Sequence, residues 1–95
     1  MAEDRDVQDL FKALNTLKDV EECRKFMLDL CTPAELEAMA DRWKAARLLK
    51  TGVSYREIYE KTGVSTATVT RVARSLSHGE GGYELLLDRL GTKRR

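Results

Sequence analysis

The sequence has few of the residues that catalysis or metal binding requires. Its 95 residues include one histidine, His78, and two cysteines, Cys23 and Cys31. His78 precedes a glycine-rich stretch with no nucleophile or set of metal ligands beside it, so an enzyme is the class that the sequence favours least. The cysteines also do not have the CxxC spacing that is typical of a zinc site. We therefore expect no catalytic residue, no bound metal and no cofactor.

A disulfide within the chain is excluded by geometry. Cys23 and Cys31 lie eight positions apart in one predicted helix, which places their Cα atoms about 12 Å apart, beyond the reach of a disulfide. No apolar run is long enough to cross a bilayer, and no secretion signal is visible. These features predict a cytoplasmic protein without membrane association, whose two thiols are buried structural residues.

The chain has one proline, no low-complexity segment and no internal repeat. With 42% hydrophobic and 35% charged residues, it is expected to form a single helical domain over residues 1–95. A chain of this length buries a smaller fraction of its surface than a longer chain does, which favours a dimer.

Charges of opposite sign are separated along the chain. Residues 1–41 hold 5 Lys/Arg against 11 Asp/Glu, a net charge of −6, whereas residues 42–78 hold 8 against 2, a net charge of +6. No acidic residue occurs from 61 to 79. A basic segment of this kind is typical of a module that meets the phosphates of a nucleic acid.

Two amphipathic helices are predicted for the N-terminal third, with a short break near residues 18–19. Asp19 is the expected N-cap of the second helix, because Glu21 and Glu22 follow it. These helices, over residues of about 5–31, offer more apolar surface than one small partner helix could cover, so we expect them to form a dimer interface. Their apolar positions are Val7, Leu10, Phe11, Leu14 and Leu17, then Val20, Cys23, Phe26, Met27 and Leu30.

Thr32-Pro33-Ala34-Glu35 is a helix-start signal, with Thr32 as N-cap and Glu35 closing a capping box. The helix is expected to end near Lys50-Thr51-Gly52, where the glycine can adopt a left-handed conformation. Its apolar side would hold Leu36, Met39, Ala40, Trp43 and Ala46, with Trp43 in the core.

The segment SYREIYEKTGVSTATVTRVARSL, residues 54–76, predicts a helix-turn-helix. Ser54 and Glu57 form a second capping box, Gly63 interrupts the short first helix, and Ser65 caps a second helix from Thr66 to about Leu76. Four apolar residues are spaced to fill the angle between the two helices: Ile58, Val64, Val69 and Val72. Tyr59 and Thr62 are less typical, because such motifs often place a small residue and a leucine at these positions.

In a helix-turn-helix the second helix lies in the major groove of double-stranded DNA. Its outward residues are expected to read bases: Ser65, Thr66, Ala67, Thr68 and Thr70, with Arg71 able to grip guanine. Arg56, Lys61 and Arg74 are the expected phosphate contacts. The alternative for the hydroxyl groups is capping and solvation of the helix surface. Residues 78–82 are expected to form a loop, followed by a last helix with Tyr83, Leu86, Leu87 and Leu90, and a frayed basic tail over residues 91–95.

Cys31-Thr32-Pro33-Ala34-Glu35, Arg42 and the helix-turn-helix segment together resemble the Trp repressor superfamily, in its YerC/YecD-type branch. The resemblance covers residues 30–90, and TATVTR at 66–71 is its most specific part. It implies an all-α fold and an intertwined homodimer that regulates transcription, as a repressor.

The resemblance also implies a corepressor pocket formed by Thr32, Arg42, Arg71 and Ser75. Val72 and Trp43 would obstruct a ring in that pocket, so tryptophan is not expected to be the effector, and another effector or none is favoured. Arg42 and Arg71 could instead pair with acidic residues of the N-terminal half or reach DNA. The rival hypothesis for the whole chain is a helical protein–protein interaction module without sequence-specific DNA binding.

Overall fold

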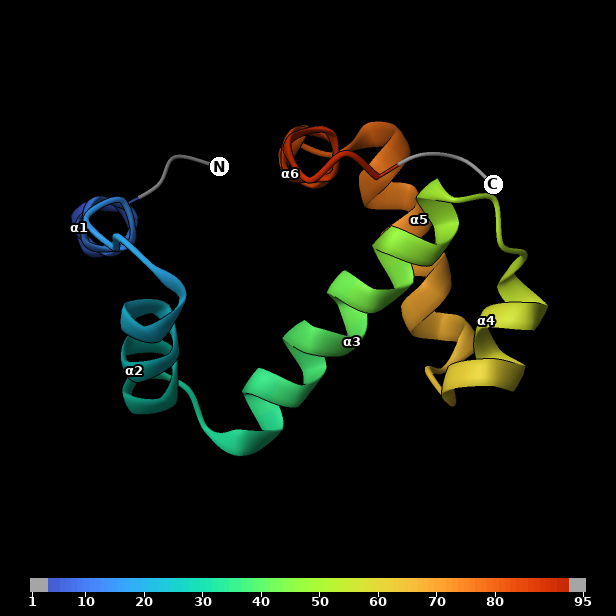
Figure 1. Ribbon diagram of the computed structural model, residues 1–95, viewed down its shortest axis with the longest axis horizontal. Coiled ribbons are helices and arrows are strands. Elements are labelled where there is room, and N and C mark those ends of the chain that lie inside the picture. The colour runs from blue at the N-terminus through green and yellow to red at the C-terminus, as the bar shows by residue number, and fades with distance from the viewer. Residues whose placement is uncertain (1–3, 93–95) are drawn as a thin grey trace. The chain divides into compact units, whose positions relative to one another are not determined.

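The computed structural model describes residues 4–92, which contain six α-helices and no strand (Figure 1). The chain divides into two compact units, Met1–Leu36 and Glu37–Arg95. The predicted all-α class is confirmed. Among the described residues, none of the helices combines the length and apolar character needed to span a membrane. The helices are α1 (Arg5–Leu14), α2 (Val20–Leu30), α3 (Pro33–Lys50), α4 (Tyr55–Thr62), α5 (Thr66–His78) and α6 (Gly82–Arg89).

The predicted N-caps are confirmed, because each satisfies an amide that the helix itself cannot pair. The side-chain oxygens of Asp19, Ser54 and Ser65 accept hydrogen bonds from the amide three residues later, at 2.8, 3.2 and 3.1 Å. These caps begin α2, α4 and α5 where the sequence predicts them.

Thr32 and Glu35 form a reciprocal capping box at the start of α3. The Thr32 amide donates to Glu35 Oε1 at 2.8 Å, and the Glu35 amide donates to Thr32 Oγ1 at 3.1 Å. The hydrogen bonds from the Thr32 amide and hydroxyl favour the ionised carboxylate, so they hold the pKa of Glu35 below its ordinary value of 4.5.

The first helix is shorter than predicted. It ends at Leu14, and the break spans residues 15–19 rather than 18–19, so Leu17 lies outside the helix. Two contacts explain the early end. Thr16 donates its amide and its hydroxyl to the Ala13 carbonyl at 3.0 and 2.7 Å, and the Lys18 amide donates to Glu22 Oε1 at 2.9 Å. The contact between the Lys18 amide and Glu22 belongs to the start of α2 and requires non-helical backbone before Asp19.

Within residues 4–36 the first unit has no core of its own, since none of these residues is buried. The prediction of two buried thiols is therefore wrong for this chain: Cys23 is exposed and Cys31 is only partly buried. Both cysteines are free, as expected. The Cys23 thiol is accessible because no other residue within 4–36 covers it.

The second unit holds the buried core, which is formed by α3, α4 and α5 together with the segments that join them. Its buried residues are Ala45, Ala46, Val53, Ile58, Val64, Val69 and Val72. The prediction that Trp43 lies in the core is wrong, because its side chain is only partly buried, and Ala40 is exposed. Ala46, which was predicted on the apolar side, is completely buried, and so is its neighbour Ala45, which was not.

The loop between α5 and α6 is shorter than predicted and consists of residues 79–81. His78 is the last residue of α5 and Gly82 is the first of α6. Gly79 allows this turn, because a Cβ at this position would lie 2.4 Å from the Ser75 carbonyl oxygen. Of the predicted basic tail, residues 93–95 lie outside the described residues. The Thr92 amide donates to the Leu87 carbonyl at 3.0 Å, which closes the end of α6.

Candidate nucleic-acid interface

A left-handed glycine separates α4 from α5. Gly63 has φ +77° and ψ 0°, and its amide donates to the Tyr59 carbonyl at 2.9 Å, which ends α4. Residues with a Cβ rarely adopt this conformation. The chain therefore turns within residues 63–65, so α4 and α5 lie against each other as two short helices (Figure 1).

Thr62 gives the turn a second constraint. Its hydroxyl donates to the Ile58 carbonyl at 2.6 Å and accepts a hydrogen bond from the Val64 amide at 3.1 Å. This threonine thus holds both sides of the turn through polar contacts, where leucine would contribute only packing. Tyr59, the other less typical residue, is 52% exposed and does not obstruct the packing of α4 on α5.

The apolar residues predicted to fill the angle between α4 and α5 do so. Ile58 and Val69 are completely buried, and Val64 and Val72 are 4% and 1% exposed. Burying aliphatic side chains of this size contributes about 1.5–3 kcal/mol each. This packing fixes which side of α5 faces solvent.

The outward side of α5 forms an open groove of about 710 Å³. It is lined by Thr66, Ala67, Thr70, Arg71, Arg74 and Ser75, all of which are exposed. Within residues 4–92, neither arginine of this groove forms an ion pair. The groove therefore combines two free guanidinium groups with small hydroxyl and methyl groups, which can approach an anionic surface closely.

Two of the predicted base-reading hydroxyls are engaged within the helix start. Ser65 Oγ accepts from the Thr68 amide at 3.1 Å and lies 2.9 Å from Thr68 Oγ1. Ser65 is exposed and Thr68 is partly buried. Ser65 thus performs the capping role that the sequence offered as the alternative, and the Thr68 hydroxyl accepts a hydrogen bond from it.

The two predicted phosphate contacts on α4 have acidic partners on the same helix. Arg56 Nε lies 2.9 Å from Glu60 Oε1, and Lys61 Nζ lies 2.8 Å from Glu57 Oε2. These pairs are solvent-exposed and therefore weak, but they reduce the positive potential that α4 presents. The positive potential near Arg56 and Lys61 is therefore lower than these two cations would produce without their acidic partners.

Two of the four residues expected to form a corepressor pocket line the α5 groove. Arg71 and Ser75 line the α5 groove, whereas Thr32 caps α3 and the partly buried Arg42 lines neither this groove nor the apolar groove described next. Among the described residues, Arg42 and Arg71 form no ion pair with an acidic side chain.

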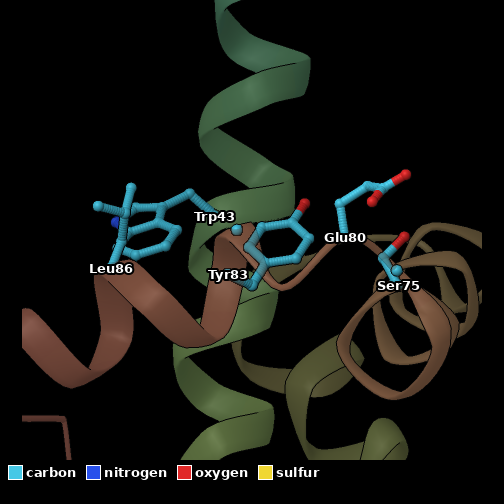
Figure 2. Close-up of a pocket in the computed structure, with 7 residues that line it drawn as sticks. Trp43, Ser75, Glu80, Tyr83 and Leu86 are labelled. Carbon is cyan, nitrogen blue, oxygen red and sulfur yellow. The ribbon is translucent and has the colours of Figure 1, made fainter.

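An apolar groove of about 500 Å³ lies beside the C-terminal end of α5. The rings of Trp43 on α3 and Tyr83 on α6 stack there, and Ser75 and Glu80 lie near the Tyr83 end (Figure 2). Leu86, also on this groove, is 47% exposed. Within residues 4–92 no group of His, Cys, Asp and Glu side chains is arranged to hold a metal ion.

The family model described as Trp repressor protein matches residues 5–91. The uncharacterized protein YerC of Bacillus subtilis (strain 168) is 44% identical over 86 residues, which are 90% of this chain and 83% of YerC. The crystal structure of a Staphylococcus aureus protein provisionally assigned as a Trp repressor has a TM-score of 0.91 at 38% identity, covering 98% of this chain and 93% of that one. A TrpR-like protein from Eubacterium eligens ATCC 27750 has a TM-score of 0.90 at 40% identity, covering 98% of this chain and 96% of the other.

Proposed function

We propose, on the premise that this chain belongs to the Trp repressor family, that it is a sequence-specific DNA-binding regulator of transcription and acts as a repressor. One observation carries the proposal: the α5 groove, with exposed Arg71 and Arg74, faces solvent at the second helix of a helix-turn-helix. In this motif, the second helix enters the major groove and the first crosses the backbone.

The charges and caps of the motif support this role. The positive end of the α5 dipole lies at Ser65, next to the hydroxyls of the α5 groove, and attracts phosphate or electron-rich base edges. Arg71 and Arg74 supply cations that pair with no carboxylate among residues 4–92. Binding through these groups would release counterions from the duplex, so affinity should fall steeply as salt concentration rises.

We further propose that the chain acts as a homodimer. Large apolar side chains of both units face solvent in the single chain, among them Phe11, Leu28 and Leu30 in the first unit and Leu85 and Leu86 in the second, each between 47% and 51% exposed. A second copy would cover such surface. The operator would then contain two half-sites related by a two-fold axis, about 10 base pairs apart or a multiple of that distance.

Tryptophan is not the proposed effector. Trp43 stacks on Tyr83 in the apolar groove that Ser75, one of the pocket residues expected from the resemblance, also lines, whereas Val72 is 1% exposed and belongs to the core. Isothermal titration of the purified dimer with L-tryptophan tests this point: no saturable heat is expected, and micromolar binding would contradict it.

In vitro selection from random duplexes tests the function itself. We expect a symmetric motif to be enriched, and we expect Thr66→Ala combined with Arg71→Ala to abolish the preference for it at moderate salt. Thr16→Ala combined with Arg24→Ala, both in the first unit, is the matched control. If no motif is enriched, sequence-specific regulation is wrong and the protein-interaction alternative gains support.

A further inference from the structure

The α5 groove is rich in methyl groups and lacks amide and carboxylate side chains. Three of its six lining residues carry a methyl group: Thr66, Ala67 and Thr70. The side chains that usually read adenine are Asn and Gln, and those that accept from cytosine are Asp and Glu. None of these types lines the groove. A helix with this composition is suited to a base that presents a methyl group in the major groove, and thymine is the base that does so in unmodified DNA.

The helix geometry places the smallest of these side chains at the N-terminal end of the outward stripe. Ala67, Thr70, Arg71 and Arg74 follow the i, i+3, i+4, i+7 spacing of one helix face. Ala67 lies at the N-terminal end of this stripe, about 10 Å along the axis from Arg74. A short side chain there lets the backbone of α5 approach the floor of the major groove, while the arginine two turns later reaches toward the phosphates.

The hydrogen-bonding pattern separates the groove hydroxyls from the capping hydroxyls. Ser65 and Thr68 bond to each other, whereas among residues 4–92 the hydroxyls of Thr66 and Thr70 form no intramolecular hydrogen bond. Both threonines are exposed. Each can therefore present its methyl group to one base while its hydroxyl bonds to water or to a neighbouring base edge.

We infer that α5 recognises thymine by its 5-methyl group, with the methyl groups of Thr66, Ala67 and Thr70 as the contacts. This inference rests on the proposed DNA-binding function. It makes Ala67 and Thr70 specificity-determining residues. It also assigns Arg71 and Arg74 to guanine or phosphate rather than to the thymine position.

The test uses the full chain and the duplex obtained by in vitro selection. Each thymine of one half-site is replaced in turn by deoxyuridine, which removes only the 5-methyl group and preserves the Watson–Crick pair. Burying one methyl-sized group corresponds to about a fourfold change in affinity. We therefore expect the Kd, measured by fluorescence anisotropy, to rise about fourfold at one or two thymine positions and to stay constant at the others.

Variants that remove only a methyl group then identify the protein side of the contact. Thr70→Ser and Thr66→Ser remove the methyl group and keep the hydroxyl, and Ala67→Gly removes the alanine methyl. Circular dichroism shows whether each variant stays helical. If one of these residues contacts the methyl group of a given thymine, its variant should bind the duplexes with thymine and with deoxyuridine at that position with equal affinity. Thr16→Ser, in the first unit, should keep the wild-type ratio. If Ala67→Gly fails to fold, Thr66→Ser and Thr70→Ser still test the methyl contacts.

The outcomes separate the inference from the function on which it rests. If selection enriches a motif but deoxyuridine changes the Kd by less than about 1.5-fold at every thymine, or if the motif contains no common thymine, methyl recognition is wrong while DNA binding stands. If the thymine preference persists unchanged in all three variants, these side chains do not carry it. If no motif is enriched at all, both proposals fail.

Discussion

The rings of Trp43 and Tyr83 stack with their centroids 6.3 Å apart and their planes at 16°, and they line an open apolar groove rather than a closed core. This relationship joins α3 to α6 and leaves the only tryptophan of the sequence partly exposed in the single chain. An exposed apolar groove of this kind is the surface that a second copy would cover.

Tryptophan fluorescence should therefore report dimer formation. Because a dimer would exclude water from Trp43, we expect its emission to shift to shorter wavelength and acrylamide quenching to weaken as the protein concentration rises. Light scattering on the same samples measures the oligomeric state independently. A dimer by light scattering whose Trp43 stays as accessible as in the monomer would place the interface elsewhere.

Replacing Gly63 with alanine should destabilise the protein by about 1–2 kcal/mol, because alanine at φ +77° is strained. Urea unfolding at fixed protein concentration measures this difference. Gly82→Ala is a matched control, since an added Cβ meets no atom within 4 Å at either position. Of these two glycines, Gly63 has a positive φ and Gly82 does not. The control should be neutral or slightly stabilising. Equal effects at the two sites would argue against backbone strain as the cause.

Acid should weaken the start of α3 through Glu35. The pKa of this carboxyl group is lowered by its hydrogen bonds to the Thr32 amide and hydroxyl, so the folded chain releases this proton at a lower pH than the unfolded chain. Its stabilising contribution is present in full above the ordinary pKa of 4.5 and is lost as the pH falls through the lowered value.

Glu35→Gln tests the acid effect, because the amide oxygen can keep the hydrogen bond but cannot titrate. We expect the difference in unfolding free energy between wild type and this variant to shrink below about pH 4.5. Glu37→Gln, which lies on the same helix outside the capping box, is the comparison. A difference that stays constant from pH 7 to pH 3 would contradict the role of the capping box.

The salt dependence of DNA binding should depend more on α5 than on α4. Each phosphate contact that is lost lowers the slope of log K against log salt by about 0.9. We expect Arg74→Gln to have an effect of this size, and Arg56→Gln a smaller one because Glu60 already neutralises Arg56. Glu60→Gln should steepen the slope by freeing that guanidinium. A larger loss for Arg56→Gln than for Arg74→Gln would reverse the assignment.

The features predicted best from the sequence are those that depend on neighbouring residues. The capping residues Asp19, Thr32, Ser54 and Ser65 begin their helices as predicted, since a cap needs only a side-chain oxygen and an amide three positions later. The turn at Gly63 was also predicted, because it depends on the left-handed conformation of this glycine and on its hydrogen bond to Tyr59 four residues earlier.

Features that depend on distant or competing contacts were predicted less well. The apolar spacing extends the first helix to Leu17, but the helix ends at Leu14, where Thr16 bonds to the Ala13 carbonyl and Glu22 accepts from the Lys18 amide. Trp43 matches a core position by spacing, yet it is only partly buried, and α3 buries Ala45 beside the predicted Ala46. The partners of Arg56 and Lys61 were missed, although Glu60 and Glu57 stand four residues away at the spacing of helical ion pairs.

The candidate site likewise has some features that the sequence predicts and others that it does not. Which residues of α5 face outward follows from the buried valines at 69 and 72, and the sequence spacing predicts both. Whether a hydroxyl caps the helix or remains available depends on side-chain geometry, which spacing does not reveal. The structure distinguishes Ser65 and Thr68 from Thr66 and Thr70 on this point.

The most direct test of the central claim is amide chemical-shift mapping of the isotope-labelled protein during titration with the selected duplex. The account predicts the largest shifts along the outward face of α5, at Thr66, Ala67, Thr70, Arg71 and Arg74, with small shifts in α6. Shifts concentrated on the Trp43–Tyr83 groove, with the α5 resonances unmoved, would contradict it.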